Sequence, residues 1–103
     1  MSNDLRSLSD VDRTIHEPSR SLILAILSAV ESADFLYLQH EIGLTRGNLS
    51  VHLSKLAEAG YIQIEKTYRG KVPLTLCRMT AAGRKAFKIY REQLRSFVNQ
   101  TNT

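Results

Sequence analysis

The 103-residue sequence predicts an α+β fold that is mainly α. Three observations predict it. Apolar residues recur at helical spacing through the first half of the chain, two alternating segments flank a polar glycine turn, and a capped apolar stripe closes the sequence. Because 43% of the residues are hydrophobic, the chain can bury one core, so we expect a single domain.

The N-terminal part of the chain predicts one clear helix. Residues 3–15 carry only a weak helical stripe, which leaves open a short helix that packs on a partner or a frayed tail. The first clear helix follows Pro18, which suits a first helical turn because it has no N–H to leave unbonded. Its broad apolar face is formed by Leu22, Ile23, Ile26, Leu27 and Val30.

Two further helices are predicted on either side of a glycine turn. Residues 35–43 indicate a short strand or turn that leads into a short helix, which Gly43 can end in the left-handed conformation. Thr45 is a good N-cap for a helix over residues 46–59, because its hydroxyl can accept a bond from a free N–H. The inward stripe of that helix is Leu49, Leu53, Leu56 and Ala57.

The last third of the sequence predicts a hairpin and a long helix. Residues 61–67 and 72–79 alternate as strands on either side of a turn that contains Arg69 and Lys71. Pro73 favours an edge position, since proline cannot donate to a strand ladder. Thr80 then caps a final helix that reaches about residue 99.

Charge is divided unevenly along the chain. Residues 1–44 carry three basic and seven acidic side chains, a balance of −4, whereas residues 45–103 carry 11 basic and three acidic ones, a balance of +8. A basic half of this kind favours a surface that binds polyanions. Composition by itself leaves open an ordinary solvated surface.

The predicted order of elements is that of a winged helix-turn-helix, in which one helix enters the major groove of DNA. Such a helix must be apolar inside and small and polar outside to fit a groove ~12 Å wide. The helix after Thr45 has this character, whereas a merely solvated face usually mixes Glu and Lys. The predicted DNA-binding residues are Thr45, Arg46, Gly47, Asn48, Ser50, Val51, Ser54 and Lys55 on this helix, with Arg69 and Lys71 on the hairpin.

Four stretches also carry a family resemblance: Asp-Arg-x-Ile-His-Glu-Pro-Ser-Arg at 12–20, Gly-Asn-Leu-Ser-Val-His-Leu-x-x-Leu at 47–56, Glu-Ala-Gly-Tyr-Ile at 58–62 and Met-Thr-Ala-Ala-Gly-Arg at 79–84. They resemble the winged-helix domain of MarR- and ArsR-type transcription regulators, most closely a small stand-alone group with an Ile-His-x-Pro-x-Arg opening. The resemblance implies a homodimer on a pseudo-palindromic operator, with the helix after Thr45 in the major groove and the hairpin as the wing.

Two departures from related patterns are visible. The older helix-turn-helix pattern prefers a small residue where Gln39 stands and an aliphatic one where His52 stands, and winged variants relax both. The Cys-x-Cys motif of ArsR-type metal sensors has no counterpart at residues 36–41, so thiolate metal sensing of that type is not expected.

The final helix predicts a dimer interface. One stripe of it carries Phe87, Tyr90, Leu94, Phe97 and Val98, and a second copy of the helix would bury this stripe. The alternative is that Phe87 and Tyr90 pack within their own chain while the tail frays from Leu94. The predicted organisation is an N-terminal segment or short helix at 1–15, a DNA-binding core at 16–80 and a dimerisation helix at 81–103.

Several other classes of protein are not favoured. No phosphate-binding glycine loop, carboxylate pair or nucleophile–base arrangement occurs, so we expect neither an enzyme nor a cofactor. The spacings between His16, His40 and His52 match no compact metal motif, so no metal site is predicted. Cys77 is the only cysteine and is expected to be a packed or half-exposed thiol. Without a membrane-spanning run or a signal-peptide pattern, the chain is expected to be soluble and cytoplasmic.

Two classes of function remain from the sequence. The first is a sequence-specific regulator of transcription that binds double-stranded DNA as a homodimer. The second is a winged-helix module that binds protein or RNA, which would more often expose Leu or Phe on the helix after Thr45. The small polar character of that helix favours DNA, and the sequence identifies no small-molecule effector.

Overall fold

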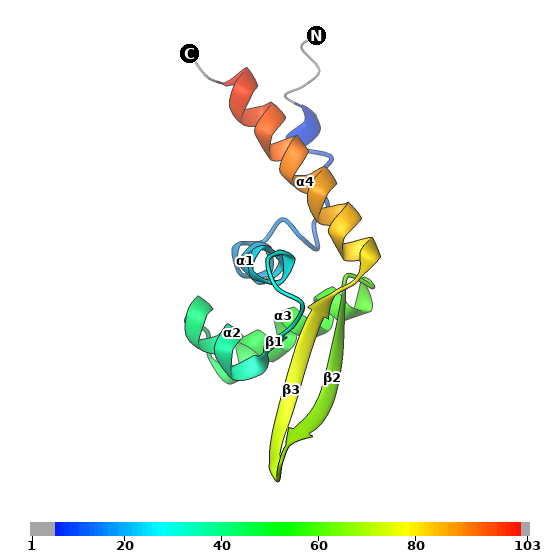
Figure 1. Cartoon of the computed structure of the whole chain (residues 1–103). Helices are drawn as coiled ribbons and strands as arrows, with labels where there is room; N and C mark the ends of the chain where they lie inside the picture. Colours follow the sequence, from blue (N-terminus) through cyan, green and yellow to red (C-terminus); the bar gives the residue numbers. More distant parts are fainter. Residues whose placement is uncertain (1–5, 102–103) are drawn as a thin grey trace.

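A computed structural model describes residues 6–101 and shows, in that range, four helices and a three-stranded antiparallel sheet (Figure 1). The helices are α1 Pro18–Ser28, α2 Phe35–Ile42, α3 Arg46–Glu58 and α4 Ala81–Gln100. The strands are β1 Ala33–Asp34, β2 Ile62–Arg69 and β3 Val72–Met79, in the order β1-β3-β2. The predicted fold class, with its hairpin and long C-terminal helix, is confirmed.

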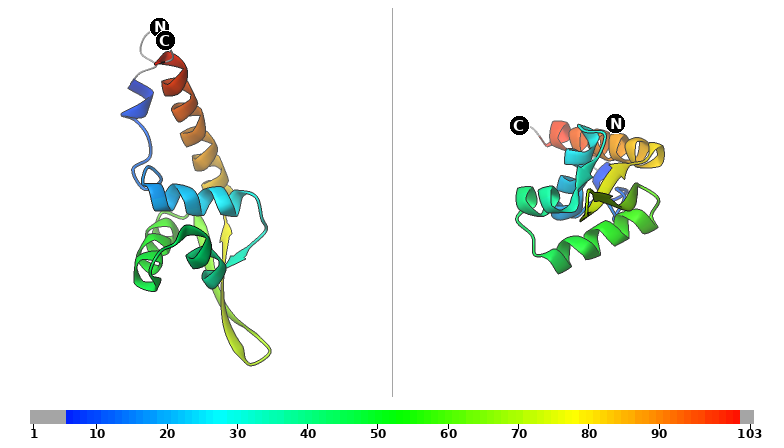
Figure 2. Two further views of the ribbon diagram at one scale, coloured as in Figure 1. Left: turned by 90° about the vertical axis from the view of Figure 1, so that its left-hand side faces the viewer. Right: turned by 60° about the horizontal axis from the view of Figure 1, so that its bottom comes forward.

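The molecule is elongated, with the helical core in the middle. The β2–β3 hairpin projects from one end, and the second half of α4 projects from the other (Figure 2). The principal extents are 58 × 26 × 21 Å and the radius of gyration is 15.4 Å, against ~13 Å for a compact domain of this length. The hairpin and the second half of α4 therefore expose surface that lies outside the core.

The core forms where α1, α2 and α3 meet the base of the sheet and the first half of α4. The predicted inward stripe of α3 is confirmed, since Leu49, Leu53 and Leu56 are buried and Ala57 is half-buried. Cys77 of β3 is fully buried beneath the helices. Burial and the nearby Asp34 carboxylate raise the pKa of this thiol to about 11, so it stays protonated at neutral pH.

The helix boundaries follow local capping chemistry. The hydroxyls of Thr45 and Thr80 accept hydrogen bonds from the backbone N–H groups of Asn48 and Gly83, as the sequence predicted. Gly43 ends α2 with a φ of 77°, in the left-handed region. The carboxylates of Glu17 and Asp34, which were not among the predicted caps, accept bonds from the N–H groups of Arg20 and Tyr37 and cap α1 and α2 in the same manner.

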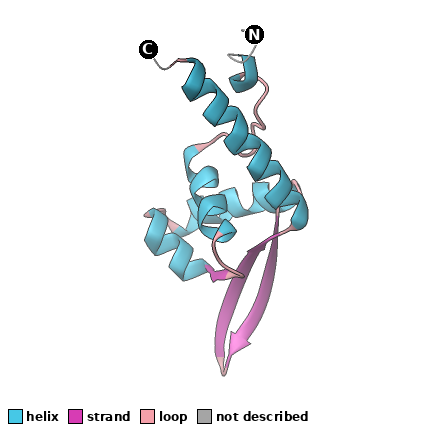
Figure 3. Cartoon of the chain, turned by 45° about the horizontal axis from the view of Figure 1, so that its top comes forward, coloured by secondary structure: helices cyan, strands magenta, loops and turns pink. Residues whose placement is uncertain are grey.

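The N-terminal segment differs from both alternatives that the sequence left open. Only one short turn of helix occurs, at residues 6–8, and residues 9–16 form irregular turns (Figure 3). Val11 and Ile15 are nevertheless buried in the core, so this segment is neither a helix nor a frayed tail. Leu5, the first apolar residue of the predicted stripe, lies outside the described residues.

The predicted apolar face of the first helix is too broad. Helix α1 buries Ile23, Leu24 and Leu27, but Leu22 is 51% exposed and Val30, beyond the end of the helix, is 39% exposed. The apolar face of α1 is wider than the surface on which it packs, so the residues at its edges remain in solvent.

The hairpin is longer than the sequence predicted. Strand β2 continues to Arg69, which pairs with Val72, so the turn contains only Gly70 and Lys71. Pro73 lies on β3, which is the central strand and not an edge strand. Because β1 pairs with β3 only at residues 76 and 77, the side of β3 opposite β2 is open at Pro73, and the missing N–H breaks no ladder there.

Candidate nucleic-acid interface

Helix α3 presents a continuous exposed surface on the side opposite its buried stripe. All of the residues on this surface, which we call the outer face of α3, are exposed: Gly47, Asn48, Ser50, Val51, Ser54 and Lys55. Val51 is the one large apolar side chain among them, at 53% exposure. The outer face therefore offers short hydrogen-bonding side chains and the methyl groups of Val51. It carries no large aromatic side chain that would block the close approach of a partner.

Arg46, at the first position of α3, is held by an aromatic ring. Its guanidinium lies 5.0 Å from the centroid of the Phe35 ring on α2, a cation–π contact. Phe35 was not predicted as a site residue. The sequence does place this aromatic residue at the start of α2, the helix that precedes α3. Its contact with Arg46, however, depends on how α2 and α3 cross, which the sequence does not show.

A groove of about 490 Å³ separates the outer face of α3 from the hairpin. Ser50 and Ser54 line its helix side, and Ile64 and Lys66 line its strand side. Ile64 lies on the same face of β2 as buried Ile62, two residues earlier, but it is 38% exposed because β2 has already left the core at this point. Lys66 is a further exposed cation beside this groove and was not among the predicted DNA-binding residues.

The tip of the hairpin carries the two predicted cations, Arg69 and Lys71, and both are exposed. Gly70 between them has a φ of 64°, a conformation that side chains other than glycine rarely adopt, so the tight turn depends on it. Within residues 6–101 neither cation has an ion pair, whereas Glu65 further down the strand is paired with Arg78 at 3.0 Å. The tip is therefore net positive.

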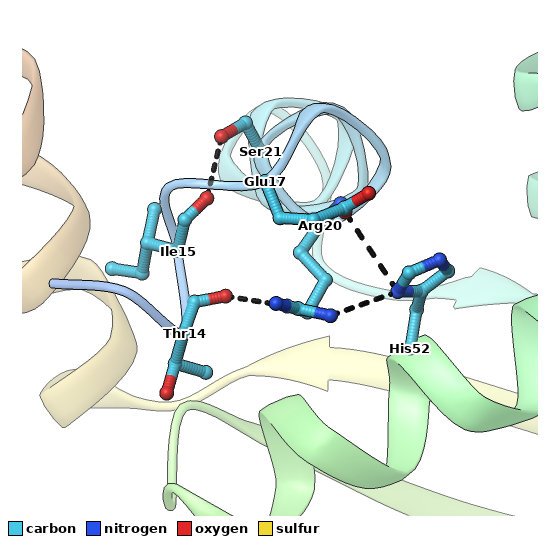
Figure 4. A network of polar contacts seen from close by, with 6 residues as sticks. All are labelled: Thr14, Ile15, Glu17, Arg20, Ser21 and His52. Atoms are coloured by element: carbon cyan, nitrogen blue, oxygen red, sulfur yellow. Dashed lines mark hydrogen bonds and ion pairs between the residues drawn. The ribbon is translucent and has the colours of Figure 1, made fainter.

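A polar network holds the inner flank of α3 against the start of α1 (Figure 4). Arg20 donates from Nε to the carbonyl oxygen of Thr14 at 2.5 Å, and its Nη1 lies 3.0 Å from Nδ1 of His52. The Glu17 carboxylate is 3.7 Å from the same nitrogen. His52, a departure from the older helix-turn-helix pattern, thus connects α3 to α1 instead of packing as an aliphatic residue.

The other two histidines and Tyr61 lie outside the outer face of α3 and the hairpin tip. Nδ1 of His16 lies 2.9 Å from the hydroxyl of Tyr90, so the turn before α1 is tied to α4. His40 is exposed on α2. Tyr61 donates to the Asp12 carboxylate, and this bond, together with burial, raises the pKa of Tyr61 to about 12. Among the described residues no three acidic, His or Cys side chains gather in a possible metal site.

The predicted dimer stripe on α4 is divided in two. Phe87 and Tyr90 are buried against their own chain, whereas Leu94 and Phe97 are half-buried and Val98 is 60% exposed. The helix does not fray at Leu94 but continues to Gln100. The part of the stripe that remains available to a partner is therefore its C-terminal end.

Comparison with known proteins agrees with this geometry. Residues 20–98 match the family model of the winged helix DNA-binding domain. The chain belongs to this family. A relative of the winged helix chain is the uncharacterized protein MJ0432 of Methanocaldococcus jannaschii, 43% identical over 72 residues, which are 69% of this chain and 77% of the relative. The predicted resemblance to winged-helix regulators is thereby confirmed.

Solved structures share the fold of this winged helix chain. A transcriptional regulator homologue from Pyrococcus horikoshii OT3 superimposes with a TM-score of 0.89 at 23% identity, over 98% of this chain and 99% of its own. The YusO protein from Bacillus subtilis has a TM-score of 0.74 at 14% identity, over 97% and 68% of the two chains. RV1404 from Mycobacterium tuberculosis has a TM-score of 0.70 at 22% identity, over 94% and 65%.

In the part of the winged helix chain that the structure describes, no helix is both long enough and apolar enough to cross a bilayer.

Proposed function

We propose that the protein is a sequence-specific regulator of transcription that binds double-stranded DNA as a homodimer on a pseudo-palindromic operator. The observation that carries this proposal is the exposed, small and polar outer face of α3 beside a net positive hairpin. Residues 16–80 bind one half-site, and residues 81–103, which contain α4, join two copies. The protein acts without catalysis or a cofactor, in the cytoplasm.

The outer face of α3 supports direct reading of bases. Arg46 can donate two bonds to guanine, and Asn48 can both donate to and accept from adenine. The Asn48 side chain is free for this role because Thr45 caps only its backbone N–H. Val51 adds an apolar contact suited to the methyl group of thymine. A protein partner would need a wider apolar area than one valine provides on this helix.

The first prediction concerns base reading. Asn48→Ala and Arg46→Ala should each lower specific affinity by about 1–3 kcal/mol and relax base preference at one position in each half-site. Arg46→Lys should lose less affinity than Arg46→Ala, since the ammonium keeps the charge and its donors but lacks the planar pair of guanidinium donors. Competition binding with single-base variants of a selected duplex measures this. Gln63→Ala, an exposed change on β2, is the control, and unchanged base preference in both alanine variants would contradict the assignment.

The second prediction concerns the hairpin. Arg69→Gln combined with Lys71→Gln should weaken binding to every duplex alike, and the slope of log affinity against log salt should fall by about 0.9 per lost phosphate contact. Lys85→Gln with Lys88→Gln removes the same charge from exposed sites on α4 and should leave the slope nearly unchanged. Titration of random duplex at several salt concentrations compares them, and an unchanged slope in the hairpin variant would show that its tip is only solvated.

The second half of α4 supports a homodimer. It extends past the core with Leu94, Phe97 and Val98 only partly covered, although the N-terminal segment reaches it through the Ser7 hydroxyl, 3.3 Å from the Gln93 carbonyl oxygen. A two-fold related copy of the same helix would bury these side chains. Two domains joined in this way could occupy two half-sites on one duplex at once.

A further inference from the structure

A second concave surface lies beside α3, on the side away from the hairpin. It is a shallow hollow of about 390 Å³ between the C-terminal end of α3 and the turn that precedes α1. Its lining residues are Arg13, Thr14, Arg20, Lys55, Glu58 and Ala59. Three of these six are cations and one is an acid, so the hollow is net positive although the N-terminal half of the chain is acidic as a whole.

Two of the three cations are free to bind a ligand. Arg13 and Lys55 are exposed, and within residues 6–101 neither side chain has a hydrogen bond or an ion pair. Arg20, in contrast, is fixed by its bonds to Thr14 and His52. Its bond to the Thr14 carbonyl holds the turn that carries Arg13, so Arg20 positions the hollow while Arg13 and Lys55 face solvent.

The hollow and the hairpin flank α3 on opposite sides. Ser50 and Ser54 line the groove toward the hairpin, whereas Lys55 lines the hollow toward the turn before α1. An α-helix with its side chains is ~10–12 Å across, close to the ~12 Å width of the major groove. A helix seated in that groove therefore has one phosphate backbone along each flank.

We infer that the hollow is a second phosphate-binding site, which holds the backbone of the DNA strand on the flank of α3 away from the hairpin. This inference rests on the proposed function. Arg13 donates from its planar guanidinium and Lys55 from its ammonium to phosphate oxygens, and Arg20 adds fixed positive charge behind them. Glu58 opposes the phosphate and limits the affinity of the site.

The test compares three variants on random duplex DNA across a range of salt concentrations. Arg13→Gln with Lys55→Gln should lower the slope of log affinity against log salt by about 0.9 per lost contact, equally for all sequences. Glu58→Gln should raise affinity. The control is Lys85→Gln with Lys88→Gln on α4, which should change neither quantity. Both side chains removed from the hollow are exposed, and circular dichroism of each variant verifies that the fold is retained.

Ethylation interference on a selected duplex locates the contact. The wild type should show two groups of essential phosphates, one on each strand beside the groove that α3 occupies. Arg13→Gln with Lys55→Gln should lose one group, and the hairpin variant should lose the other. An unchanged slope and unchanged interference in the hollow variant would overturn the inference while leaving the proposed function intact. Failure of the wild type to bind duplex DNA would overturn both.

Discussion

Phe97→Asp combined with Val98→Asp should separate the proposed homodimer into folded monomers and lower operator affinity on the order of 10²–10⁴-fold. Val98 is exposed and Phe97 is half-buried, and neither belongs to the buried core. Two carboxylates placed in an apolar contact between helices would be buried without partners, which strongly disfavours association. Each half-site would then be held by a single domain, without the gain from linked binding.

Sedimentation equilibrium measures the oligomeric state of this variant, and duplex binding measures its affinity. Asn99→Asp is the matched control, because it adds negative charge to the same turn of α4 at an exposed site on the opposite side of the helix. The control should remain dimeric. A double variant that also remained dimeric would place the interface elsewhere, for which the exposed side chains Leu22 and Ile89 are the next candidates.

Gly83→Ala should destabilise the fold by about 2–3 kcal/mol, as expected when a methyl group is forced into a packed site. A Cβ at this position would lie 2.1 Å from the carbonyl oxygen of Tyr61 and 2.9 Å from its carbonyl carbon. These are backbone atoms, so α4 would have to move away from the end of the loop that joins α3 to the hairpin. The Tyr61 oxygen also accepts the N–H of Thr80 at 3.0 Å, and that bond would be disturbed as well.

Gly47→Ala is the matched control for this change and should act in the opposite direction. A Cβ on Gly47 meets nothing within 4 Å, and alanine favours a helix over glycine by up to ~1 kcal/mol. Urea unfolding of both variants measures the two effects. Equal stability of Gly83→Ala and wild type would contradict the close approach of α4 to Tyr61.

Features set by neighbouring residues were predictable from the sequence. The limits of α3 depend on the Thr45 cap and on a stripe three or four residues apart, and both are visible in sequence. The outer face of α3 follows directly, because residues on the side of the helix opposite the buried stripe must face outward, whereas His52, at the edge of the stripe, contacts α1. The basic hairpin was recognised for the same reason, since its alternation and its turn are local.

Features set by the packing of distant segments were not predictable. Val11 and Ile15 reach the core through irregular turns, which have no periodicity to detect. Arg13 and Lys55 line the same hollow across a distance of 42 residues in sequence, where Arg20 ties the turn before α1 to His52 on α3. The burial of Phe87 and Tyr90 within their own chain depends on where α4 crosses the core, and a helical stripe alone does not indicate which chain will cover it.

Selection of bound sites from a random pool of duplex DNA decides whether two copies of α3 read base sequence in the major groove. We expect enrichment of a site with two inverted half-sites whose centres are one helical turn, ~10–10.5 base pairs, or a multiple of it apart. Retention should also fall steeply with salt. A pool that shows no enriched sequence, together with stronger retention of RNA or of a protein partner than of duplex DNA, would contradict it.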